Sequence, residues 1–402
     1  MFNYKYFDDL SIELIDGDRG KNYPKNDEML EKGYCLFLNA KNVTLNGFVF
    51  DENVFITKEK DEILRKGKLN RNDIVLTTRG TIGNVGLYDD KITYDNVRIN
   101  SGMLIIRNND NNINTKYLYY QLTSPFIRNQ IFSLKTGSAQ PQIPITVLKK
   151  LKLIIPDKRI QDKIVRVMDS IINKLTLNNE INNNLHDLAE QQFNEIYLKG
   201  SPKKLGELLV NISTGSRPKG GAQDCGVPSI GAEKIEKFGV YNYSSEKYIS
   251  EEYYEKLKNG KLNSGDVLLY KDGAYTGKVS MCLNDFPHKK AAVNEHVFIL
   301  NTKNNWAQNY LYFTLYNKDN KEMIHRLACS KAAQPGLNQI ELKSIEVNIC
   351  DEKEIINFEN SVKPIMEKIS SNTLENKKLV ELRDTLLPKL MNGEIDLDNI
   401  EI

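Results

Sequence analysis

The chain has 402 residues, of which 40% are hydrophobic, and a formal net charge of only +2 at pH 7. This length is sufficient for two domains with cores of their own, and the composition is that of a globular protein. No apolar run approaches the roughly 20 residues needed to cross a bilayer, and the chain opens on polar sequence without a signal peptide. We therefore expect a cytoplasmic protein.

Residues 1–156 are predicted to form a first block that is rich in strands. In this block a polar turn leads into an apolar strand over 68–76, and the strand runs into a Gly-rich loop over 77–83. The elements expected after it are an aromatic helix around 117–120, an Ala-Gln-Pro loop at 139–141 and a strand at 151–155.

A long amphipathic helix is predicted over residues 157–199. Its seam follows alternating steps of four and three, as a heptad repeat requires. The seam residues are Ile164, Met168, Ile171, Leu175, Asn178, Asn182 and Leu185.

A second copy of this organisation follows. Block 200–350 repeats the strand at 261–269, the Gly-rich loop at 270–277, the aromatic helix around 310–313, the Ala-Gln-Pro loop at 333–335 and the strand at 345–349. A second long helix is expected over 351–393, before a tail at 394–402. Its seam, 194 positions after the first, is Phe358, Val362, Ile365, Ile369, Asn372, Asn376 and Leu379. Two seams in register, each with Asn at the same two central positions, indicate an internal repeat.

The two helices are predicted to pack as an antiparallel coiled coil. Buried Asn at seam positions fixes register at some cost in stability, so we expect Asn178 near Asn376 and Asn182 near Asn372. Pro364 lies inside the second helix, where its missing N–H favours a kink or a late start. The alternative is two separate core helices.

Charge is distributed unevenly along the chain. Residues 1–156 contain 22 Lys and Arg against 18 Asp and Glu, and 200–350 contain 20 against 16. The long-helix segments are not basic, with 6 against 7 in 157–199 and 7 against 12 in 351–402. If phosphate is bound, we expect the blocks to bind it while the helices contact protein. Ordinary surface variation is the other interpretation of these small excesses.

The sequence offers no clear catalytic site. His186, His288, His296 and His325 show no metal-ligand spacing, and the five scattered cysteines form no Cys-x-x-Cys pair. There is no P-loop, no Gly-x-Ser-x-Gly motif and no Asn-Pro-Pro-Tyr-like tetrapeptide. We expect neither a metal site nor catalysis, although a nuclease built on spaced acids and a lysine stays open.

The run 379–395 (LVELRDTLLPKLMNGEI) resembles the C-terminal conserved helix of the specificity subunits of type I restriction-modification enzymes. The strands with Gly-rich loops and the Ala-Gln-Pro loops are also similar to that family, so the resemblance covers essentially the whole chain. It implies an α+β fold, in which two pseudo-symmetric, strand-rich target-recognition domains are joined by two long antiparallel coiled-coil helices.

The resemblance further implies a non-catalytic subunit that reads a split, asymmetric target in double-stranded DNA and holds two modification subunits. Restriction subunits would be further partners, and S-adenosylmethionine and ATP would be bound by partner subunits rather than by this chain. A helix of about 40 residues extends roughly 60 Å, which leaves room for half-sites one DNA turn, about 34 to 36 Å, apart.

Candidate DNA-binding residues lie on matching loops of the two blocks, where Arg, Lys, Gln and Asn can reach phosphates or base edges. Early basic loops contain Arg19 and Lys21 in the first block and Arg217 and Lys219 in the second. On the loops after the strands, Tyr270 and Lys271 are taken as the counterparts of Thr78 and Arg79. The Ala-Gln-Pro loops add Lys135, Gln140, Lys331 and Gln334. Each of these side chains, taken singly, is equally compatible with a solvated loop.

Two other functions remain open from the sequence. One is a duplicated scaffold that bridges two protein partners without reading DNA, and the other is a methyltransferase or nuclease with degenerate motifs. A steep salt dependence of duplex binding separates the DNA reader from the scaffold. Binding of S-adenosylmethionine by the isolated chain would favour the enzyme.

Overall fold

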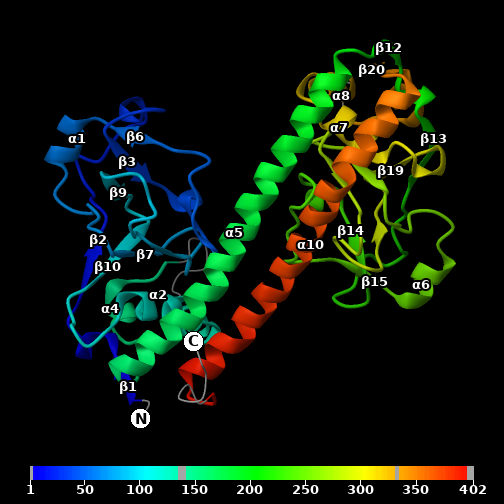
Figure 1. Ribbon diagram of the computed structural model, residues 1–402. Coiled ribbons are helices and arrows are strands. Elements are labelled where there is room, and N and C mark those ends of the chain that lie inside the picture. The colour runs from blue at the N-terminus through cyan, green and yellow to red at the C-terminus, as the bar shows by residue number, and fades with distance from the viewer. Residues whose placement is uncertain (1–2, 135–141, 331–334, 396–402) are drawn as a thin grey trace. The chain divides into compact units, whose positions relative to one another are not determined.

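The computed structural model describes residues 3–134, 142–330 and 335–395 and divides into two compact units (Figure 1). Unit 1 comprises Met1–Asn173 and Val380–Ile402, and unit 2 comprises Lys174–Leu379. Both divisions fall inside long helices of 40 residues, α5 (Lys158–Tyr197) and α10 (Glu352–Met391). Each unit therefore contains one block, the start of one long helix and the end of the other.

The described elements of block 1 are β1 (Asn3–Tyr6), β2 (Ile12–Asp16), β3 (Cys35–Leu38), β4 (Val43–Thr44), β5 (Gly47–Phe48), β6 (Phe55–Ile56), α1 (Lys58–Ile63), β7 (Ile74–Thr77), β8 (Val85–Leu87), β9 (Val97–Ile99), β10 (Met103–Asn108), α2 (Thr115–Thr123), α3 (Pro125–Ser133), α4 (Ile145–Leu148) and β11 (Lys152–Ile155).

Those of block 2 are β12 (Ser201–Lys204), β13 (Leu209–Thr214), β14 (Val227–Ile230), β15 (Tyr248–Ile249), α6 (Glu251–Lys256), β16 (Val267–Tyr270), β17 (Val279–Met281), β18 (Ala292–Val293), β19 (Val297–Thr302), α7 (Gln308–Tyr316), α8 (Lys318–Cys329), α9 (Gln339–Ser344) and β20 (Glu346–Ile349).

The repeat seen in the sequence is also a repeat of sheet topology. In unit 1 the strand orders are β1-β11, β2-β10-β7-β8 and β6-β3-β9, and in unit 2 they are β12-β20, β13-β19-β16-β17 and β15-β14-β18. Even the parallel pairs correspond, since β3 runs parallel to β9 and β14 parallel to β18. Unit 1 has the hairpin β4-β5 in addition. Both units are therefore mixed, strand-rich domains with helices.

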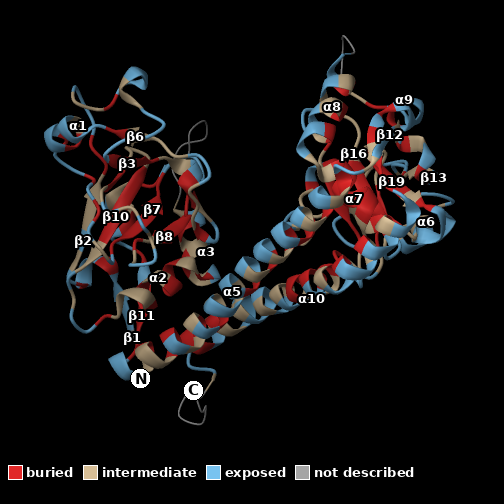
Figure 2. Cartoon of the chain, turned by 45° about the horizontal axis from the view of Figure 1, so that its top comes forward, coloured by how far each residue is buried: buried red, intermediate tan, exposed pale blue. Residues whose placement is uncertain are grey.

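The aromatic helices are fixed to the sheets by the same hydrogen bond in both units. The hydroxyl of Tyr117 on α2 donates to the carbonyl of Ile154 on β11 at 2.8 Å, and that of Tyr310 on α7 donates to Asn348 on β20 at 3.0 Å. Both tyrosines are buried, as are the central strands β7 and β10 of unit 1 (Figure 2). Because a buried hydroxyl needs a partner, this bond also fixes where each helix lies along its strand.

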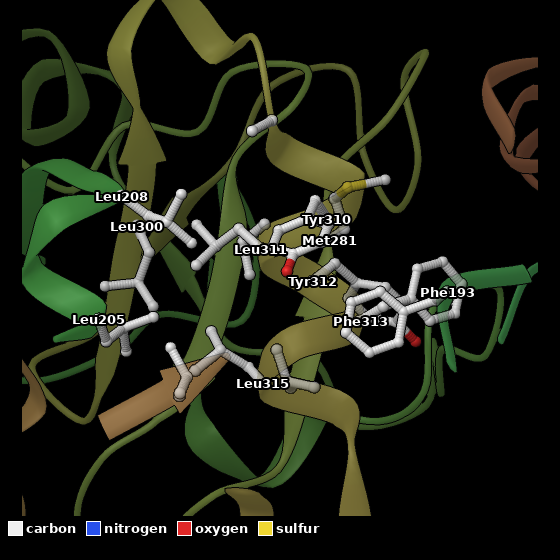
Figure 3. Close-up of a cluster of buried hydrophobic side chains, with 14 of the residues drawn as sticks. Phe193, Leu205, Leu208, Met281, Leu300, Tyr310, Leu311, Tyr312, Phe313 and Leu315 are labelled. Carbon is white, nitrogen blue, oxygen red and sulfur yellow. The ribbon is translucent and has the colours of Figure 1, made fainter. Parts of the chain in front are cut away.

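In unit 2 the long helices are held to the block by aromatic side chains. Phe193 of α5 lies beside Tyr310 and Phe313 of α7 (Figure 3), with ring centroids 5.3 and 5.8 Å away, and 5.9 Å from Phe358 of α10. Such pairs contribute about 0.5–1.5 kcal/mol beyond their burial. Unit 1 uses aliphatic side chains in the corresponding place, chiefly Leu387, Leu390 and Met391 of α10.

Both asparagine pairs expected from the heptad repeat are present in unit 2. Nδ2 of Asn178 donates to Oδ1 of Asn376 at 2.8 Å, and Nδ2 of Asn372 donates to Oδ1 of Asn182 at 2.9 Å. Further along, the Ser361 hydroxyl donates to Oε1 of Gln192 at 2.9 Å. Along these three pairs the residue number on α5 rises while the residue number on α10 falls, so the helices are antiparallel in unit 2.

The seam residues are distributed between the two units. Those that are buried are Ile164, Met168, Ile171, Asn178, Asn182, Phe358, Val362, Ile369 and Asn372, while Leu175, Leu185, Ile365, Asn376 and Leu379 are half-buried.

The helices begin and end within two residues of the predicted bounds. The late start at Pro364 is wrong, because α10 begins at Glu352 and continues through this proline. None of the described helices has the length and apolarity that a bilayer crossing requires.

Replacing one partner of an asparagine pair is expected to cost more stability than replacing both. Asn372→Ala leaves Oδ1 of buried Asn182 without this donor, a loss of about 1–3 kcal/mol. The double variant Asn182→Leu/Asn372→Leu should recover much of that loss, because no amide is then left unpaired. Urea unfolding followed by circular dichroism measures both. A double variant less stable than Asn372→Ala would contradict this account.

Candidate nucleic-acid interface

Two candidate loops of unit 1, those after β2 and β7, meet at one edge of its four-stranded sheet. Strands β2 and β7 both pair antiparallel with β10, which lies between them. Their carboxyl ends therefore lie at the same edge, beside residues 100–102 at the start of β10. The predicted residues Arg19, Thr78 and Arg79 follow these strand ends, so the topology explains why they come together.

Arg19 and Arg79 line one surface hollow of about 320 Å³. One guanidinium nitrogen of Arg19 lies 2.9 Å from a carboxylate oxygen of Asp16, and Arg19 is half-exposed. Nε of Arg79 donates to Oε1 of Gln142 at 3.2 Å. The rest of the lining is Thr78, Leu104, Ile143, Pro144, Ile145 and Thr146. Two guanidinium groups on one hollow are suited to phosphate or to a purine edge, since each offers donors in a planar fork.

Thr78 has a different place from its neighbour. Its side chain is buried, and its hydroxyl and its backbone N–H both donate to the carbonyl of Gly102, at 3.0 and 2.8 Å. Thr78 therefore shapes the loop and does not present its hydroxyl to a ligand. Lys21 lies in the exposed turn after β2.

The equivalent edge of unit 2 is built with more acidic groups. A guanidinium nitrogen of Arg217 lies 3.0 Å from Glu295, and Lys219 is exposed two residues further on. Nζ of Lys271 donates to Asp272 at 2.5 Å, and Nδ1 of His296 lies 3.3 Å from the same carboxylate oxygen. The charge of Lys271 is thus balanced by its neighbour.

The hydrogen bonds correct the predicted correspondence between the strand-end loops. The Thr78 carbonyl accepts from Ile143 N, and the Lys271 carbonyl accepts from Leu337 N, so Lys271 corresponds to Thr78. Tyr270, half-buried at the end of β16, then corresponds to Thr77. The expected pairing of Tyr270 and Lys271 with Thr78 and Arg79 is therefore wrong by one residue, because it matched residue types rather than strand register.

The true counterpart of Arg79 is Asp272. Arg79 forms an isolated β-bridge with Gln142, and Asp272 forms one with Gly336. Sequence reasoning missed Asp272 because it looked for basic side chains, although the offset of 193 between strands β7 and β16 would have found it. Gln142 and His296 were also missed. Lys135, Gln140, Lys331 and Gln334 lie outside the described residues.

Comparison with known proteins finds relatives that cover most of the chain. A family profile described as "Type I restriction modification DNA specificity domain" matches residues 12–187. The specificity subunit of the type I restriction enzyme MjaIX of Methanocaldococcus jannaschii is 24% identical over 358 residues, covering 82% of this chain and 79% of that protein. The specificity subunit of HindI of Haemophilus influenzae is 23% identical over 462 residues, covering 94% and 98%.

Residues 12–187 thus match the type I restriction-modification DNA specificity domain, and the chain is similar over most of its length to specificity subunits of type I restriction enzymes. The crystal structure of the type I S subunit from M. genitalium has the same fold, with a TM-score of 0.57 at 16% identity, and the match covers 97% of this chain and 96% of that one.

In this chain, one glycine in each unit holds the early basic loop against the sheet edge. A Cβ on Gly17 would lie 2.1 Å from the carbonyl oxygen of Asn100, and one on Gly215 would lie 1.6 Å from that of Val293. Both glycines directly follow the last residue of β2 or β13. Only a residue without a side chain permits this approach, so the two units share the backbone platform on which their loop side chains differ.

The residue after each glycine differs between the two units and makes different hydrogen bonds. The Asp18 carboxylate accepts backbone N–H groups of Arg19 at 2.7 Å and Arg65 at 2.6 Å. Burial alone would raise the pKa of Asp18, but these hydrogen bonds and the Arg65 charge hold it below its ordinary value. In unit 2 this position is Ser216, whose hydroxyl lies 2.8 Å from that of Tyr253.

Gly215→Ala is expected to destabilise unit 2, since a backbone carbonyl cannot move aside without displacing β18. Overpacking of this kind costs roughly 1–3 kcal/mol, seen as a lower midpoint of urea unfolding. Ser216→Ala is the matched control, because it alters the exposed neighbour without adding volume. Equal midpoints for Gly215→Ala and the unaltered chain would show that the platform tolerates a side chain.

Proposed function

We propose that the chain reads a two-part, asymmetric sequence in double-stranded DNA, one part with each unit, and is not itself a catalyst. The observation that carries this proposal is the pair of equivalent sheet edges with different chemistry. Unit 1 presents Arg79 beside Gln142, whereas unit 2 presents Asp272 between Lys271 and His296. One backbone platform with two sets of side chains suits the recognition of two different half-sites.

The loop residues divide into two groups by comparison between the units. Arg19 and Arg217 occupy equivalent positions after β2 and β13, as do Lys21 and Lys219. Residues that are alike in both units suit phosphates, which are alike in both half-sites and are the commonest contacts to DNA. We assign these four to positioning on the backbone.

Residues that differ between the units suit base reading. Arg pairs best with the O6 and N7 atoms of guanine, while Asp accepts from the amino group of cytosine. Gln142 adds a group that can pair with adenine. We therefore assign Arg79 and Gln142 to the half-site of unit 1 and Asp272 to that of unit 2. Thr78, a candidate DNA-binding residue from the sequence, is not assigned a contact with DNA, because its hydroxyl donates to the carbonyl of Gly102 within the protein.

We further infer that the chain assembles with two modification subunits and, where the system cuts DNA, with restriction subunits. S-adenosylmethionine and ATP would be bound by those partners. The internal repeat supports two equivalent partner sites, because each unit contributes the start of one long helix and the end of the other. We place the protein in the cytoplasm, with its proposed DNA ligand.

A scaffold that joins two proteins without reading DNA is the second candidate. The duplicated helices are compatible with it, but the buried glycine platforms that support exposed basic loops have no purpose in such a scaffold. The two functions differ in salt dependence. A DNA reader loses affinity steeply as salt rises, with a slope of about −0.9 for each phosphate neutralised.

Arg79→Ala, in the complex with the modification subunits, is expected to weaken binding to the cognate duplex by about 1–3 kcal/mol and to relax one position of the unit 1 half-site. Fluorescence anisotropy at matched salt, with a set of single-base variants of the duplex, measures both effects. Arg159→Ala is the control, since it removes an exposed arginine of the same unit from α5. Equal losses from both variants would remove Arg79 from the readers.

Lys219→Ala should behave differently from Arg79→Ala. Loss of a phosphate contact weakens all duplexes alike and reduces the salt slope by about 1. A change in base preference for Lys219→Ala would show that the division into positioning and reading residues is wrong.

Mapping of methylated positions in genomic DNA tests the whole proposal. The chain is co-expressed with its modification subunit, and the recognised motif should consist of two parts with unlike sequences. Asp272→Asn should alter only the part that Arg79→Ala leaves intact. Methylation at a continuous motif would contradict the two-part reading, and no methylation together with salt-independent duplex binding would favour the scaffold.

A further inference from the structure

A second cluster of titratable side chains lies on α5 within unit 2, and none of its members belongs to the candidate loops. His186, Asp187 and Glu190 each place one ligand atom within 4.8 Å of the other two. His186 and Glu190 lie one helical turn apart, a spacing that puts both side chains on the same face. Asp187 is exposed and Glu190 half-buried, while the imidazole is 1% exposed.

The imidazole of His186 has one nitrogen in use and one without a partner. Nε2 lies 2.9 Å from the hydroxyl of Tyr312, which also accepts the backbone N–H of Phe238 at 3.1 Å. The ring is further held by Tyr316, with centroids 4.8 Å apart. Nδ1 is buried and makes no hydrogen bond. It lies 3.8 Å from a carboxylate oxygen of Glu190.

That separation is too long for a hydrogen bond. A buried polar atom without a hydrogen-bond partner is destabilising, so the position of Nδ1 is unfavourable as it stands.

We propose that His186, Asp187 and Glu190 bind a divalent transition-metal ion of the Zn²⁺ class. Nδ1 and one oxygen from each carboxylate are ligands that such an ion takes at about 2.0–2.2 Å. Two ligands of one ion are then about 3–4 Å apart, which is close to the separation of Nδ1 from Glu190. Metal binding at Nδ1 uses the tautomer in which Nε2–H donates to the Tyr312 hydroxyl, the kind of outer contact that orients metal-binding histidines.

The surroundings leave room for the ion to enter and for water to complete its shell. Asp187 and Glu190 open on a shallow surface hollow of about 450 Å³, lined also by Gln191, Asn194, Glu195 and Leu198. The ammonium group of Lys237 donates to Oδ1 of Asn183 at 2.9 Å. Because Tyr312 is on α7, a bound ion would brace α5 against the core of unit 2.

The test is titration of the metal-free full-length chain with ZnCl₂ by calorimetry, and with CoCl₂ by visible absorption. One equivalent should bind, and the midpoint of thermal unfolding should rise, because an ion that binds only the folded state stabilises it. Asp187→Asn and Glu190→Gln, both near the surface, should each weaken binding about tenfold or more. His186→Gln should abolish the Co²⁺ absorption band.

Glu180→Gln is the matched control, since it removes the same charge from an exposed position on the same helix. It should bind Zn²⁺ as the unaltered chain does. The proposal is overturned if the unaltered chain binds no metal, or if Glu190→Gln binds as tightly as Glu180→Gln. The proposal does not rest on DNA recognition, so either can fail without the other.

Discussion

Two amide pairs on α5 and α10 set the register on which the rest of unit 2 depends. Amides that meet inside a seam tolerate no slip, because a shift by one turn would leave buried donors and acceptors unpaired. When Asn182 lies opposite Asn372, Phe193 packs against Phe358, and both rings contact α7. Apolar side chains alone would permit several alignments of two such helices. The polar pairs select one alignment of the two helices, and the aromatic core of unit 2 packs in that alignment.

Sequence reasoning succeeded where the structure is set by local pattern. An apolar run followed by glycines located β7 and β16, and a strict heptad count located the amide pairs. It failed where contacts between distant residues decide the outcome. The counterpart of Arg79 is defined by a bridge to Gln142, 63 positions away, rather than by residue type. Likewise, the unpaired nitrogen of His186 depends on a tyrosine hydroxyl 126 positions along the chain.

The comparison of the two units gives the candidate residues a meaning that single positions lack. The glycine contacts recur at Gly17 and Gly215, so the loop backbones are supported alike. Within these supports, Arg79 and Asp272 carry opposite charges at equivalent positions. Under the proposed function, side chains that are alike in both units would contact any DNA, and those that differ would contact one sequence. The charge excess of the blocks, weak by itself, fits the same division.

The construction of each unit from both ends of the chain has a consequence for biosynthesis. The core of unit 1 includes Leu387, Leu390 and Met391, which are synthesised after the whole of unit 2. Unit 2, at Lys174–Leu379, is complete before them. Domains usually fold in the order in which they are made. Here the amino-terminal unit cannot complete its core until the end of α10 has been synthesised, and until then part of its apolar surface is exposed. During translation that surface is open to chaperones until the end of α10 has been made.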